Sequence, residues 1–118
     1  MKQSEIKFTI TLDEKNVPQN IEWSASDANK ESTSKAVMIA LWDTRERNTL
    51  RIDLWTKDMM VDEMKQFYHQ NLLSMADSFE RATGEVDAAK AMRHFAQEFG
   101  ERLMLVKKSS IDSPGMDK

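Results

Sequence analysis

Cysteine is absent from this chain of 118 residues. Its absence excludes a disulfide framework, a thiol nucleophile and any metal site built on thiolates. Glycine and proline are scarce, at three and two residues, and the scattered glycines cannot form a phosphate-binding loop. No apolar run approaches the roughly 20 residues that a membrane-spanning helix requires, and Met1–Glu5 lead into a strand pattern without the apolar core of a secretory signal. We therefore expect a cytoplasmic protein that does not insert into membranes.

Neither sign of charge dominates the composition. The chain carries 17 basic and 20 acidic residues, for a net charge of −3 at neutral pH. Neither half offers the basic face that binding to nucleic acid or to an anionic membrane requires. Nucleic acid is therefore not an expected partner, and the length is that of a single domain.

Alternation of apolar and polar residues predicts two hairpins. Residues 6–12 and 21–25 alternate with period two around a polar, turn-rich stretch. Residues 27–34 are polar and predict a loop. Residues 36–42 are apolar throughout, and residues 50–55 alternate again after a polar connection. Four antiparallel strands are therefore expected.

Spacings of three and four predict two helices in the second half. The first should begin between Asp58 and Asp62 and end near Gly84, a residue suited to a left-handed C-terminal position. The second should run from Val86 to Leu105. The apolar stripe of the first helix is Val61, Met64, Tyr68, Leu72, Met75, Phe79 and Ala82. The inward positions of the second are Ala89, Met92, Phe95, Ala96, Phe99 and Leu103.

The predicted fold class is α+β. Four strands form one four-stranded antiparallel sheet of two hairpins, and two C-terminal helices pack on one face. This single domain covers residues 1–106. Residues 107–118 carry Ser, Pro and Gly with little apolar mass, which predicts a disordered tail.

A second sheet face remains apolar in this arrangement. Two helices cover one face, yet the third strand offers apolar side chains to both, and Met38, Trp42 and Trp55 are predicted on the uncovered side. We expect these three residues to form an interaction face for a second copy or another protein. The alternative is that the loop at residues 27–34 or the tail covers them.

No group of residues in the sequence has the types and spacing of a catalytic site. His69 and His94 lie on different helices without a metal-ligand motif. Asp53 is compatible with a general acid or base, but a cross-strand ion pair with Arg45 or Arg47 is the favoured interpretation. The nine methionines fit a core, or alternatively an adaptable binding surface. We expect a non-enzymatic protein with no cofactor and no metal.

Several segments carry a resemblance to a known family. The runs Thr49–Met59, Val61–Met64 and Ser74–Thr83, with Ile6–Thr9, Ile21–Trp23 and Trp42–Asp43 upstream, together resemble the gliding motility-associated protein GldC family. The resemblance covers about residues 5–106. One departure is Met60, where a proline opening the helix is expected.

The resemblance implies an accessory role in bacterial gliding motility or its surface secretion machinery, through protein–protein interaction. It transfers no catalytic or ligand-binding residue. The β-β-β-β-α-α order is also similar to that of SecB-type export chaperones, in topology alone. Two hypotheses follow: an accessory interaction protein, with chaperone-like binding of clients as one form of it, or a structural homo-oligomer.

Overall fold

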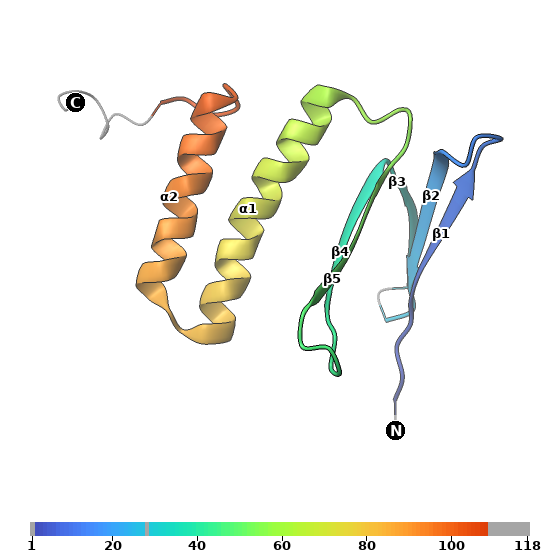
Figure 1. Cartoon of the computed structure of the whole chain (residues 1–118), viewed down its shortest axis with the longest axis horizontal. Helices are drawn as coiled ribbons and strands as arrows, with labels where there is room; N and C mark the ends of the chain where they lie inside the picture. Colours follow the sequence, from blue (N-terminus) through green and yellow to red (C-terminus); the bar gives the residue numbers. More distant parts are fainter. Residues whose placement is uncertain (1, 28, 109–118) are drawn as a thin grey trace. The chain divides into compact units, whose positions relative to one another are not determined.

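The chain is an α+β protein in the computed structural model, which describes residues 2–27 and 29–108. It divides into two compact units, Met1–Met60 with the strands and Val61–Lys118 with the helices (Figure 1). The single domain stays a prediction, as does the packing of the helices on a sheet. From residue 109 onward the tail lies outside the described residues.

The first hairpin joins β1, Ile6–Leu12, to β2, Pro18–Ala25. The two strands pair antiparallel with Ile10 opposite Ile21, so their apolar side chains share one face. Ile21 is fully buried and is therefore part of the core of this unit. This hairpin agrees with the sequence pattern.

A third strand in the first sheet was not predicted. Residues 30–34, expected as part of a loop, form β3, Lys30–Ser34, which pairs antiparallel with β2. It lies at the edge of the three-stranded sheet, and its polar composition lacks the apolar alternation that marks a half-buried strand. Sequence alternation therefore could not detect it.

The second hairpin joins β4, Ala36–Trp42, to β5, Thr49–Trp55, as predicted. The prediction of one four-stranded sheet is wrong, because the described strands form a sheet of three and a sheet of two. A single residue, Lys35, separates β3 from β4. Its carbonyl accepts the Thr56 N–H at 2.8 Å, which continues the β4–β5 ladder at the point where the chain passes between the sheets.

The helical unit contains α1, Val61–Thr83, and α2, Val86–Arg102. The start of α1 falls within the predicted interval. Gly84 has a φ of +73° and donates its N–H to the Glu80 carbonyl, as a helix C-terminal glycine does. Neither helix, among the residues described, is long and apolar enough to cross a membrane.

Helix α2 ends three residues before the predicted Leu105. Met104 adopts a φ of +60° and donates to the Glu101 carbonyl, and Leu105 donates to the Gly100 carbonyl at 2.8 Å. These two bonds are those of a Schellman motif, which satisfies the last carbonyls and turns the chain out of the helix. The apolar pattern continues past this turn and thus extended the prediction.

The buried residues of the helical unit are mostly small, and we call this set of residues the seam. The buried residues of this unit are Ala76, Ala89, Ala96 and Gly100, together with His69. The predicted stripe of α1 lies beside this seam, so Val61, Tyr68 and Met75 are exposed. Phe95, predicted to face inward, is exposed too and stacks on Phe99 at 5.9 Å between ring centroids. At Gly100 the packing leaves no room for a side chain, because a Cβ there would lie 2.7 Å from the His69 Nε2.

Candidate functional site: the second hairpin

The tip of the β4–β5 hairpin is held by one carboxylate. Asp43 accepts the N–H groups of Arg45 and Glu46 at 3.1 and 2.6 Å. Its own N–H donates to the Asn48 carbonyl, and its carbonyl accepts the Arg47 N–H, both at 2.9 Å. Arg47 adopts a left-handed φ of +56° to close the loop. The tip is therefore fixed by local bonds and orients both strands.

Alternation divides the hairpin into two faces, each read from the strand register. We call one the aliphatic face; it consists of Val37, Ile39, Leu41, Leu50, Ile52 and Leu54. We call the other the tryptophan face; it consists of Ala36, Met38, Ala40, Trp42, Thr49, Arg51, Asp53 and Trp55.

The three residues predicted as an interaction face all lie on the tryptophan face. Trp42 is 68% exposed and Trp55 is 53% exposed, whereas Met38 is partly buried. The two indoles are at opposite ends of the hairpin, because Trp42 pairs with Thr49 and Trp55 pairs with Ala36. They do not form one apolar patch within a single chain.

An ion pair occupies the middle of the tryptophan face. The Arg51 Nη2 lies 2.8 Å from the Asp53 Oδ1, and its Nε donates to the Asp53 Oδ2 at 3.2 Å. This bidentate pair replaces the predicted partnership of Asp53 with Arg45 or Arg47. Residues two apart on a strand share a face, whereas those two arginines lie in the turn. Charge therefore separates the two tryptophans.

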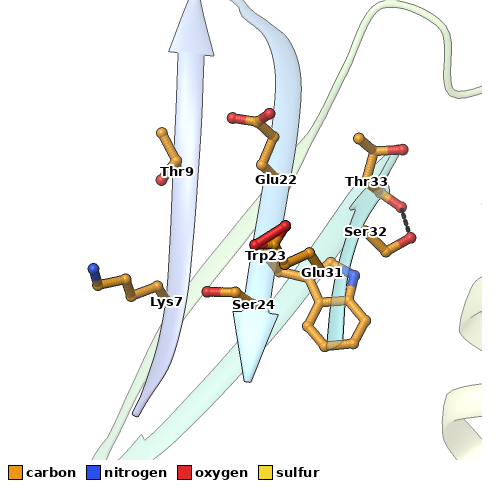
Figure 2. Close-up of a pocket in the computed structure, with 8 residues that line it drawn as sticks. All are labelled: Lys7, Thr9, Glu22, Trp23, Ser24, Glu31, Ser32 and Thr33. Atoms are coloured by element: carbon orange, nitrogen blue, oxygen red, sulfur yellow. Dashed lines mark hydrogen bonds between the residues drawn. The ribbon is translucent and has the colours of Figure 1, made fainter. Parts of the chain in front are cut away.

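The first sheet carries an open polar depression of about 370 Å³ (Figure 2). It extends over β1, β2 and β3 and follows two cross-strand rows. These rows are Lys7–Ser24–Glu31 and Thr9–Glu22–Thr33, with Trp23 and Ser32 completing the lining. Hydroxyl groups and carboxylates in an open depression are typical of a hydrated sheet face.

The histidines are not brought together. His69 is buried in the helix seam, and His94 places its Nε2 at 3.4 Å from Glu98 one turn later on α2. The described part of the chain holds no group of three or more His, Cys, Asp or Glu side chains placed for a metal ion. The absence of an enzyme activity stays a prediction.

Sequence reasoning missed the bidentate pair and the exposure of β5. Opposite charges two positions apart on a strand, at Arg51 and Asp53, were the available signal for the pair. The exposure had no signal, since Leu50 and Ile52 follow the pattern of buried residues yet are 49% and 48% exposed.

Fold and site together define a small α+β protein with an exposed, tryptophan-bearing hairpin. The family model described as gliding motility-associated protein GldC-like matches residues 18–105, and the chain belongs to this family. The match confirms the resemblance found in the sequence and associates the chain with gliding motility. No curated protein and no solved structure matches it.

Proposed function

We propose that this chain is a non-enzymatic accessory protein of the gliding motility or surface secretion machinery. It acts in the cytoplasm by binding a protein partner through the tryptophan face of the β4–β5 hairpin. Membership of the GldC-like family supports the process. The observation that carries the binding mode is the exposure of two tryptophans, Trp42 and Trp55, on the same face.

Tryptophan and arginine are the residues most enriched at the energetic centres of protein interfaces. The tryptophan face presents two indoles and Arg51, all on a hairpin whose tip is fixed by Asp43. A preformed surface loses little conformational entropy on binding, so more of the contact energy remains as affinity. These features favour a partner that accepts an indole in a pocket.

Affinity capture from the lysate of a gliding bacterium tests this proposal. The wild-type chain should retain a specific partner, and Trp42→Lys should reduce its recovery at least about tenfold, because a charge would replace the indole that the partner buries. Met104→Lys is a matched control, since Met104 is 88% exposed and lies outside the hairpin. Equal recovery by all three chains would refute the role of the tryptophan face.

A chaperone-like activity is the second candidate function. It is favoured by the exposure of apolar side chains on β1 as well, where Ile6 is 69% and Leu12 48% exposed. Such a chain should suppress the aggregation of a chemically denatured client at equimolar concentration, measured by light scattering. Failure with several unrelated clients would exclude this candidate and leave specific partner binding.

A further inference from the structure

Strand β5 has one edge along which no other described strand pairs, and the hydrogen-bonding pattern of that edge can be assigned. Bonds at both ends of the ladder, Asp43 N–H to the Asn48 carbonyl and Thr56 N–H to the Lys35 carbonyl, identify the hydrogen-bonded pairs between β4 and β5. Because such pairs alternate along an antiparallel ladder, the other residues of β5 direct their main-chain groups away from β4. These residues are Thr49, Arg51, Asp53 and Trp55.

This edge carries neither a proline nor a bulge, the two backbone features that block pairing. Among the described strands β5 pairs with β4 alone, and every residue of β5 except Leu54 is exposed. An edge strand of seven residues without proline or bulge is a template for another strand. A sheet of only two strands is also marginal in water, and added strands stabilise it.

We propose that β5 pairs antiparallel with β5 of a second copy of this chain, across a two-fold axis beside Ile52. In this register Arg51 of each copy lies opposite Asp53 of the other. The outward main-chain groups of both residues meet, and about eight hydrogen bonds join the two strands. Two cross-strand ion pairs join the two intrastrand pairs in a network of four charges.

Charge selects this register over its neighbours. Sliding one strand by two residues keeps the faces aligned but places Arg51 opposite Arg51, or Asp53 opposite Asp53, of the second copy. Like charges directly opposite are unfavourable. Sliding one strand by a single residue would bring the aliphatic face of one copy onto the same side of the sheet as the tryptophan face of the other. The proposed register alone combines opposite charges with matched faces.

The same register joins both faces of the hairpin. On the aliphatic face, Ile39 and Ile52 of one copy continue into Ile52 and Ile39 of the other, within a four-stranded sheet. On the tryptophan face, Trp55 shares a row with Thr49 and Trp42 of the second copy. The indoles that lie at opposite ends of one hairpin therefore come together in pairs, about 9–10 Å apart between strands. Each tryptophan site is completed by the second copy.

The edge of β1 offers no such selection. If β1 paired with β1 of a second copy across a two-fold axis at Thr9, Lys7 would lie opposite Thr11. These two residues do not form an ion pair. Lys7→Asp therefore serves as an edge control that leaves the β5 interface unchanged.

Oligomeric mass tests the ion pairs. Light scattering after size exclusion at high micromolar concentration should give twice the 13.7 kDa of one chain for wild type and for Lys7→Asp. Arg51→Asp places two acids opposite each other and Asp53→Arg two bases, so each variant should raise the dissociation constant at least about tenfold. An equimolar mixture of the two variants should recover the dimer, since every cross-strand pair is then of opposite charge.

A disulfide tests the axis. The native chain has no cysteine, and Ile52 opposite its own copy is a non-hydrogen-bonded pair with Cα atoms about 4.5 Å apart, within reach of a disulfide. Ile52→Cys should thus form a covalent dimer under mild oxidation. Ile39→Cys, at the neighbouring position on β4, should remain monomeric on a denaturing gel because two strands separate the thiols.

Any one of four results would overturn the pairing. The wild-type chain could be monomeric, or either single charge variant could dimerise as well as wild type. Mixing the two charge variants could also fail to recover the dimer, or both cysteine variants could crosslink equally. These readouts need no partner protein, so the pairing can fail while partner capture succeeds, and the reverse. A monomer whose partner recovery falls in Arg51→Asp would instead indicate an extended peptide of another protein on this edge.

Discussion

At the scale of the residue, Asp13 shows how one carboxylate organises a turn. It accepts the N–H groups of Lys15 and Val17 at 2.8 and 3.0 Å and forms an ion pair with Lys57. The bond from Lys57 and the two main-chain bonds lower the pKa of the Asp13 carboxyl from 3.8 to about 2. Asp13 therefore links the first hairpin to the segment that follows β5.

This shift predicts a pH-dependent contribution to stability. Because the pKa in the folded state is below the ordinary value, the contribution is fully present above pH 3.8 and is lost as the pH falls toward 2. Asp13→Asn should lower the urea midpoint of unfolding at neutral pH, and most of the difference from wild type should be lost by pH 2. A difference that persists unchanged at pH 2 would contradict ionisation as its cause.

Residue-scale predictions from the sequence succeeded where backbone conformation depends on one side chain. Gly84 was expected in a left-handed conformation and has it. The partner of Asp53 was predicted wrongly, because the choice among three nearby arginines depends on which of them share its strand face. The sequence shows charge and spacing but not where the turn begins.

At the scale of the element, the helix pair depends on the lack of a side chain at Gly100. A Cβ placed there would lie 2.7 Å from the His69 Nε2 and 3.0 Å from the Val106 Cγ2. Both distances are shorter than an unstrained contact, and His69 is buried. The seam therefore has no room for a methyl group unless the imidazole moves and the Val106 side chain gives way slightly.

Gly100→Ala should accordingly destabilise the chain by up to about 2 kcal/mol, since overpacking costs about 1–3 kcal/mol and the gain in helix propensity offsets about 1 kcal/mol of it. Chemical unfolding measures this difference. Combining it with His69→Ala removes the clashing ring, so in that background Gly100→Ala should become neutral or stabilising. A destabilisation of equal size in both backgrounds would exclude the contact with His69.

Both hairpins and both helices were predictable because their apolar periodicities are strong. Strand β3 was not, since a polar edge strand is recognised only by the strand it pairs with. The seam was displaced for a similar reason. Large apolar residues such as Tyr68 and Met75 dominate the pattern, whereas Ala76 and Gly100 define the contact. Periodicity identifies the apolar face of a helix. It does not show whether small residues or bulky ones form the contact with the neighbouring helix.

At the scale of the whole molecule, the three tryptophans report on association. Trp42 and Trp55 are exposed, whereas Trp23 is partly buried. Pairing through β5 brings the exposed indoles of two copies together and reduces their contact with solvent. No pattern within one chain predicts this, because the rows of the tryptophan face are completed by a second copy.

Fluorescence quenching by acrylamide should therefore weaken as the concentration of the wild-type chain rises into the dimer range. In Arg51→Asp the quenching constant should stay the same over that range, because this variant remains monomeric. A constant value for wild type, at concentrations where light scattering gives a dimer, would show that the tryptophans lie outside the interface.

The positions of Arg51 and Asp53 on the edge of β5 have one more consequence, which concerns cells that hold several related chains. A homologue carrying both charges in exchanged order would pair with its own copies in the same register. It would meet this chain with like charges at both positions and be rejected. Two residues are thus enough to keep parallel assemblies of nearly identical subunits insulated from each other, while every other feature of the fold stays common to them.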